Sequence, residues 1–453
     1  MMLRAVSAST MMAARAAAGS ARAVAVSSSR RLSSMVALEE EYSGTPATMP
    51  SVPPAPSTKM STLSNGTKVV THENSQLAGC IGLVVGSGSR DETTAQSGAS
   101  ILLQNMAYNR TQERSSIRLH RDVETAGGVV TAIAGREAMT YIADCPPEAA
   151  EVVLEAIAES VVKPKIVPWD LKDVKAKLEQ VGLRLYGESS AAQVEEALHA
   201  AAFGDSSPLG QPLNYGSCAL SHEALIEFQE GRYKAPGMTV VGVNVPHASL
   251  AAMAEAALEG VDASAPPARK AARFIAGELR IRATTPTTSI SIALSTPAAS
   301  DSSAPAYEVL AAVLDARAKA ATPAGSGFEY SYSDAGLVGV TGTVEHAEVG
   351  ALAHSLIGCL KGIADGPSPA EMEAAMAAAS VGRLLKMENP SDAGLALAKA
   401  AGSGADPAVG SLEGVSPAAV KAAAAAAVKS GLSVAVVGQV GEVPHKIDIE
   451  GMI

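Results

Sequence analysis

The stretch from residue 98 to 111 (GASILLQNMAYNRT) carries the polar side chains whose spacing comes nearest to a metal or catalytic site. In a helix over this stretch, Ile101, Gln104 and Asn105 share one face. Ile offers no donor atom to a metal, and the neutral amides of Gln and Asn are poor zinc ligands. Gln also cannot accept a proton from water as a carboxylate does. By themselves these residues predict an amphipathic helix with exposed amides.

A second face of the same helix is apolar. Ala95, Ala99, Leu102 and Met106 follow one another at spacings of four, three and four residues. This period is typical of a helix that turns one side to a hydrophobic core. We therefore expect all four side chains to be buried.

No other stretch supplies a replacement site. His222 and Glu223 begin like a zinc motif, but the second His is missing. Gly86 and Gly88 precede the helix as in a phosphate-binding turn, yet no third Gly and no Lys follow, and residues 323–327 (PAGSG) predict a flexible turn without a phosphate-binding Lys. The remaining histidines show no metal-ligand spacing: His72, His120, His199, His247, His346, His354 and His445. We expect no bound metal or cofactor.

The composition bounds the architecture and the partners. A chain of 453 residues has room for two or more domains, and one Trp with four Phe means that aliphatic side chains must fill the cores. The net charge is −11. Residues 1–38 contain five Arg and no acidic residue, so the rest of the chain has 30 basic and 46 acidic residues, or −16. This acidity argues against nucleic acid as a partner.

Residues 1–34 have the composition of a targeting segment. Arg4, Arg15 and Arg22 lie within about 20° of one another around a helix, among Ala, Ser, Met and Val. Such an acid-free, Arg- and Ser-rich amphipathic helix predicts a mitochondrial transit peptide, cleaved near Leu32. A disordered tail and a chloroplast transit peptide are the alternatives. Residues 35–57 hold five Pro with Ser and Thr, which predicts a linker.

The cysteines and the apolar segments suggest a soluble protein in a reducing compartment. Four cysteines lack C-x-x-C spacing, so free thiols are the simple interpretation: Cys80, Cys145, Cys218 and Cys359. The most apolar stretch, 415–440, is interrupted by Lys421, Lys429 and Gly431. We expect the chain to reach a membrane only by docking onto a spanning partner.

Periodicity and turn residues predict a first run of strands and helices. Asn65-Gly66 favours a type I′ hairpin turn after Thr62. Pro146-Pro147-Glu148 opens a helix with apolar Val152, Val153, Ile157 and Val161. The strands expected in this half are 67–71, 80–86, two within 127–144, and 238–245, and the further helices are 116–125, 171–184 and 191–201.

The second half repeats this plan, which predicts an internal duplication. Val240–Gly242 and Val436–Gly438 are the same tripeptide, 196 residues apart, each followed by Pro-His. The elements expected are strands at 278–283, 289–295, near 330, 337–344 and 432–440, and helices at 304–319, 346–363, 369–387, 391–401 and from Ser416-Pro417. The fold class is then α+β, with two tandem α/β units that each have a mainly antiparallel sheet flanked by helices.

Several runs resemble the pitrilysin-type (M16) metallopeptidases, which include the mitochondrial processing peptidase and the core proteins of the cytochrome bc1 complex. The helix resembles their H-x-x-E-H zinc helix with Ile101, Gln104 and Asn105 in place of His, Glu and His. The third ligand would fall among residues 182–185 (GLRL), flanked by Glu179 and Glu188. The other similar runs are Gly86–Arg90, Leu198–Phe203 with Ser207–Gly210, and Tyr233–Met238.

The resemblance implies domains at 58–262 and 273–453, joined by a linker at 263–272, without peptidase activity. Ser331–Leu337 (SYSDAGL) resembles a run of bc1 core protein 2, and Ala316–Gly327 is short and lacks the Gly-rich loop of the processing-peptidase α subunit. The implied role is a structural or assembly subunit on the matrix side of the inner membrane. Its partners would be core protein 1 or a β-like homologue, cytochrome b, cytochrome c1 and the Rieske protein. The alternative is the presequence-binding α subunit.

Overall fold

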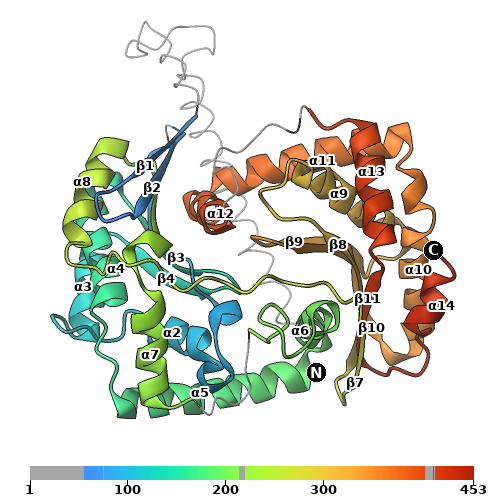
Figure 1. The fold of residues 1–453 in the computed structure, drawn as a ribbon, viewed down its shortest axis with the longest axis horizontal. Helices are drawn as coiled ribbons and strands as arrows, with labels where there is room; N and C mark the ends of the chain where they lie inside the picture. Colours follow the sequence, from blue (N-terminus) through green and yellow to red (C-terminus); the bar gives the residue numbers. More distant parts are fainter. Residues whose placement is uncertain (1–55, 75, 214–219, 404–411, 413) are drawn as a thin grey trace, which may run out of the picture. The chain divides into compact units, whose positions relative to one another are not determined.

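The computed structural model describes residues 56–74, 76–213, 220–403, 412 and 414–453, apart from the side chains of Leu185 and Tyr186. The predicted transit peptide 1–34, nearly all of the linker 35–57, and Cys218 lie outside the described residues. The described residues form one compact unit. Within it the strands make two sheets, and helices pack against both (Figure 1).

The first sheet has six strands in the order β1-β2-β6-β3-β5-β4. The closing strand β6 runs parallel to β2 and antiparallel to β3, and the other pairs are antiparallel. The strands and helices of this first half of the chain are β1 (Ser57–Thr62), β2 (Lys68–Glu73), β3 (Gly79–Val85), α2 (Ala99–Met106), α3 (Ser116–Thr125), β4 (Val129–Ala134), β5 (Met139–Cys145), α4 (Ala150–Val162), α5 (Pro168–Glu188), α6 (Ser190–Phe203), α7 (His222–Arg232), β6 (Met238–Val243) and α8 (His247–Ala257).

The second sheet repeats this plan with five strands in the order β7-β11-β8-β10-β9. Its closing strand β11 is again parallel to one neighbour, β7, and antiparallel to the other, β8. The elements are β7 (Glu278–Arg282), β8 (Thr287–Thr296), α9 (Ala304–Ala321), β9 (Gly325–Ser331), β10 (Gly336–Glu345), α10 (Val349–Leu360), α11 (Pro369–Glu388), α12 (Pro390–Ser403), α13 (Pro417–Lys429), β11 (Leu432–Gly438) and α14 (Lys446–Glu450). The predicted fold class is confirmed.

Two local predictions are wrong for local reasons. The β1–β2 turn has a positive φ at Gly66 alone, so it is a type I turn with a glycine bulge and not type I′. Residues 325–327 begin β9 and do not form a flexible turn, because they pair with β10. The predicted helix that follows Pro146-Pro147-Glu148 is present as α4, and its core face runs through Val153, Ile157 and Val161, while Val152 is 41% exposed.

The two halves exchange helices across the sheets. Helix α6 from the first half packs against β7, β8 and β11 of the second sheet (Figure 1). Helix α12 from the second half packs against β3, β5 and β6 of the first sheet. Two hydrophobic clusters result, one centred on Leu198 of α6 and the other on Leu397 of α12. Each sheet thus buries one of its faces with a helix from the other half.

One helical stretch, His346–Asp365, is long and apolar enough to cross a membrane by length and composition. It contains α10, which packs against α9 and β10 and buries Leu352, Leu356 and Leu360. Its apolar side chains therefore contribute to the second core. The stretch 415–440 that looked most apolar in the sequence is divided between α13 and β11.

Candidate functional site

Helix α2 begins later than the apolar stripe predicted. Gly98, with a φ of 88°, precedes it, and Ala95 lies in a separate 3-10 turn where it is exposed. Ala99 and Leu102 are fully buried in the first core, and Met106 packs at its edge. The prediction of a buried stripe holds from Ala99 onward, but it is wrong for Ala95, because the backbone turns at Gly98.

The second face of α2 is fixed by contacts within the protein. Ile101 is buried. The Gln104 side-chain oxygen accepts a hydrogen bond from the Ala134 backbone N–H at 2.9 Å, at the end of β4. The Asn105 amide donates to the carbonyl of Ile101, also at 2.9 Å. The sequence-predicted site residues therefore share a helix face, and their two amides have structural partners.

The region expected to hold a third zinc ligand is part of the uninterrupted helix α5. Glu179 is exposed, and Glu188 is exposed and paired with Arg184 at 3.2 Å. Among the described residues, no group of three His, Cys, Asp or Glu side chains lies close enough to hold a metal ion. His222 instead contacts the Ile166 carbonyl at 3.1 Å.

A buried carboxylate caps the start of α2. The two oxygens of Glu92 accept hydrogen bonds from the backbone N–H groups of Gly98 and Ser100, both at 2.7 Å. Burial raises the pKa of Glu92 to about 7, although these hydrogen bonds oppose the shift. Sequence reasoning missed this residue. An acidic residue just before a helix was the available signal.

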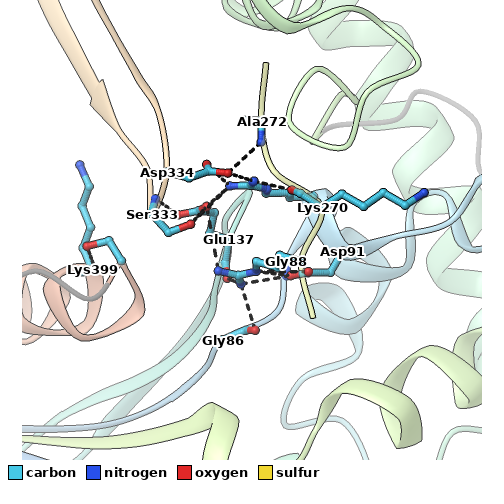
Figure 2. A network of polar contacts seen from close by, with 12 residues as sticks. Gly86, Gly88, Asp91, Glu137, Lys270, Ala272, Ser333, Asp334 and Lys399 are labelled. Atoms are coloured by element: carbon cyan, nitrogen blue, oxygen red, sulfur yellow. Dashed lines mark hydrogen bonds and ion pairs between the residues drawn. The ribbon is translucent and has the colours of Figure 1, made fainter. Parts of the chain in front are cut away.

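Two runs that resemble family motifs meet where the halves join (Figure 2). Arg90 of the first half binds both carboxylate oxygens of Asp334 in the β9–β10 turn, at 2.6 and 2.7 Å. It also pairs with Glu137, from the β4–β5 turn, at 2.5 Å. Ser333 donates its N–H and its hydroxyl to Glu137 at 2.8 and 2.6 Å. We call Arg90, Glu137, Ser333 and Asp334 the clasp.

The clasp is a buried, bidentate arrangement. The side chains of Arg90 and Glu137 are 1% and 9% exposed, and that of Asp334 is one-third exposed. Burial opposes ionisation of Asp334, but the hydrogen bonds from Arg90 outweigh it and hold the pKa of Asp334 below its usual value. Planar guanidinium and carboxylate groups bind strongly in this geometry. The clasp therefore joins the halves and offers no free catalytic group.

A second contact joins the runs at Leu198–Phe203 and Ser331–Leu337. His199 of α6 lies 2.7 Å from the Tyr332 hydroxyl and 2.8 Å from the carbonyl of Glu195. Burial, reinforced by the charge of Arg136, holds the pKa of His199 well below its usual value. This histidine is a neutral hydrogen-bonding group between the halves, and sequence reasoning left it without a role.

Comparison with known families matches both halves of the chain. Residues 68–215 match the family "Insulinase (Peptidase family M16)". Residues 219–379 match the family "Peptidase M16 inactive domain". The chain belongs to the M16 family. Its two sheets are the tandem α/β domains of that family, and the expected resemblance is confirmed at this level.

Mitochondrial M16 proteins of two kinds are similar to the chain. The mitochondrial-processing peptidase subunit alpha of Solanum tuberosum is 31% identical over 53% of this chain and 48% of the relative. Cytochrome b-c1 complex subunit 2 is 27% identical in Mus musculus and 26% in Homo sapiens, over 72% and 74% of this chain and 76% and 79% of those relatives. The match with the potato subunit spans about half of its length.

Proposed function

We propose that this chain is a non-catalytic scaffold subunit of the mitochondrial bc1 complex, on the matrix side of the inner membrane. Ile101, Gln104 and Asn105 occupy the zinc-helix positions in this proposal, and 58–262 and 273–453 are the two domains, joined at 263–272. Residues 1–34 act as the transit peptide. The chain carries none of the electron-transfer chemistry and supplies contact surface to a homologous partner and to the membrane-spanning subunits.

The non-catalytic role is supported chiefly by the hydrogen bonds that the polar side chains of α2 make. The Gln104 and Asn105 amides are engaged by Ala134 and Ile101. An active zinc peptidase needs imidazole and carboxylate ligands and a general base. Neutral amides held by the backbone cannot take those roles.

The bc1 assignment is supported by the breadth of the match and by one short connection. The alignments with bc1 subunit 2 cover about three quarters of this chain and of those relatives. Helix α9 ends at Ala321 and β9 begins at Gly325. Three residues connect them, which leaves no room for the Gly-rich loop that the resemblance attributes to α subunits.

The test is an affinity purification from mitochondrial membranes in mild detergent. The proposal predicts that cytochrome b, cytochrome c1 and the Rieske protein copurify with this chain in equal amounts. Recovery of only a homologue with an intact H-x-x-E-H motif, in a soluble pair that cleaves presequences, would overturn it.

The presequence-binding α subunit is the second candidate. It is favoured by the 31% identity with the potato α subunit and by the net charge of −16 outside residues 1–38, which suits an Arg-rich ligand. The same purification separates the two candidates by which partners it recovers.

A further inference from the structure

The segment between the two sheets carries an arginine whose guanidinium group is hydrogen-bonded to several groups of the first half. We call residues 266–277 the strap; they have no regular secondary structure. The Nε and Nη2 atoms of Arg269 lie 3.2 and 3.1 Å from the carboxylate oxygens of Asp91. Nη2 also donates to the carbonyls of Gly86, at 3.0 Å, and Glu137. Nη1 lies 4.0 Å from the Glu137 carboxylate.

These partners form a socket whose shape suits a guanidinium group (Figure 2). The Asp91 carboxylate and two backbone carbonyls accept hydrogen bonds from the planar guanidinium group, and the Glu137 carboxylate adds a second negative charge 4.0 Å away. An ammonium group would not match this arrangement. The Asp91 and Glu137 side chains are 1% and 9% exposed, so the socket is shielded from water. Charge, planarity and desolvation all favour arginine over lysine here.

The socket belongs entirely to the first half. Gly86 and Asp91 lie in the loop after β3, and Glu137 lies in the β4–β5 turn. Arg232 also holds Asp91 at 3.3 Å, and Arg90 also holds Glu137. Each of the two carboxylates therefore has a second arginine partner besides Arg269.

The strap is attached on either side of Arg269. Arg232 donates to the Pro267 carbonyl at 3.0 Å, and Arg90 donates to the Lys270 carbonyl at 2.7 Å. The Ala272 N–H donates to Asp334 at 2.8 Å. The clasp residues thus hold the backbone of the strap, and Arg269 is the side chain that it inserts.

A pocket of about 320 Å³ adjoins the socket. Its walls include Gly86, Arg232 and Arg269 together with Pro266 and Pro267 of the strap. This volume lies at the lower end of the range for small-molecule sites. The pocket lies beside Arg269, on the strap side of the socket.

We propose that the socket formed by Gly86, Asp91 and Glu137 is a guanidinium-binding site that Arg269 occupies in cis, so that an arginine side chain of a partner binds there only when the strap moves aside. The strap is then an internal competitor for the site. The inference does not depend on which mitochondrial complex contains the chain, because it concerns contacts within residues 86–272.

The test removes the Arg269 side chain from the socket in the full chain and adds small cations in solution. The Arg269→Ala variant is titrated with methylguanidinium and, separately, with methylammonium, and binding is followed by calorimetry and by the thermal midpoint. We expect saturable methylguanidinium binding that raises the midpoint by several degrees, because a ligand that binds only the folded state stabilises it. Methylammonium should leave the midpoint unchanged.

Arg273→Ala is the matched control. Arg273 lies in the same strap, is exposed, and forms no ion pair within the described part of the chain. This variant and the wild-type chain should bind neither cation, because Arg269 still fills the socket.

Either of two results would overturn the inference: equal responses of Arg269→Ala to the two cations, or methylguanidinium binding of the same strength in the Arg273→Ala control. Arg269→Gln provides a second variant that keeps an amide donor. If both Arg269 variants unfold, refolding in methylguanidinium but not in methylammonium supports the site, and refolding in neither rejects it.

Discussion

The polar face of α2 and the clasp are two hydrogen-bonded regions of opposite character. On α2 the side chains are neutral amides, each with one backbone partner. In the clasp, a buried arginine binds two carboxylates from two different turns. In our proposal, the first region occupies the zinc-helix positions of the family without the zinc-binding side chains. The comparison teaches that one buried cluster of charged side chains lies where the two halves meet.

The largest expected effect comes from breaking the clasp. Arg90→Ala leaves Glu137 and Asp334 without their main cation, and removing one partner of a buried pair costs about 3–5 kcal/mol. Chemical unfolding of the variant measures the loss. Arg184→Ala is the control, because its pair with Glu188 is largely exposed and such pairs contribute about 0–1 kcal/mol. Equal losses in the two variants would show that the clasp is not a special contact.

A second variant breaks the exchange of helices without touching a charge. Leu397 of α12 is 1% exposed and packs on the first sheet. Leu397→Ala should lower the unfolding free energy by about 2–5 kcal/mol, the range for buried Leu. The exposed Leu384 of α11 provides the control. A loss below that of Leu384→Ala would contradict the packing described.

The buried Glu92 should make stability depend on pH near neutrality. Burial raises its pKa to about 7 from 4.5, so the folded state binds this proton more tightly than the unfolded state between those values. Stability contributed by Glu92 is therefore present below about pH 4.5 and is lost as the pH rises through about 7.

Unfolding measured from pH 4.5 to 8 in the wild type and in Glu92→Gln tests this sign. The difference between their unfolding free energies should fall as the pH rises. Glu329 has its pKa raised in the same direction by burial, and it is common to both proteins. A difference that stays constant with pH would show that Glu92 titrates normally.

The smallest expected effect comes from the face of α2 itself. Gln104→Ala removes the acceptor for the Ala134 N–H, and Asn105→Ala removes one amide–carbonyl bond. Each should cost about 0.5–1.5 kcal/mol, the net value of an ordinary hydrogen bond. A loss of unfolding free energy as large as that of Arg90→Ala would show that the polar face of α2 stabilises the fold as much as the clasp does.

The sequence by itself determined the type and order of most elements. The apolar runs gave β3, β6 and β11, and the Ser416-Pro417 cap marked the start of α13, where Ser416 accepts from the Ala419 N–H. It also located Ile101, Gln104 and Asn105 on one helix. These features are local, since periodicity and capping depend on neighbours within a few residues.

Only the tertiary structure decided which surfaces meet. The periods of α6 and α12 show an apolar face and do not say that each covers the other half's sheet. The run at Gly86–Arg90 and the run at Ser331–Leu337 were visible as motifs, but nothing local indicated that Arg90 binds Asp334, 244 residues away. The same holds for Arg269 and Asp91. Such long-range partners are set by how packed elements bring distant turns together, because a side chain's charge specifies the kind of partner and not its place in the chain.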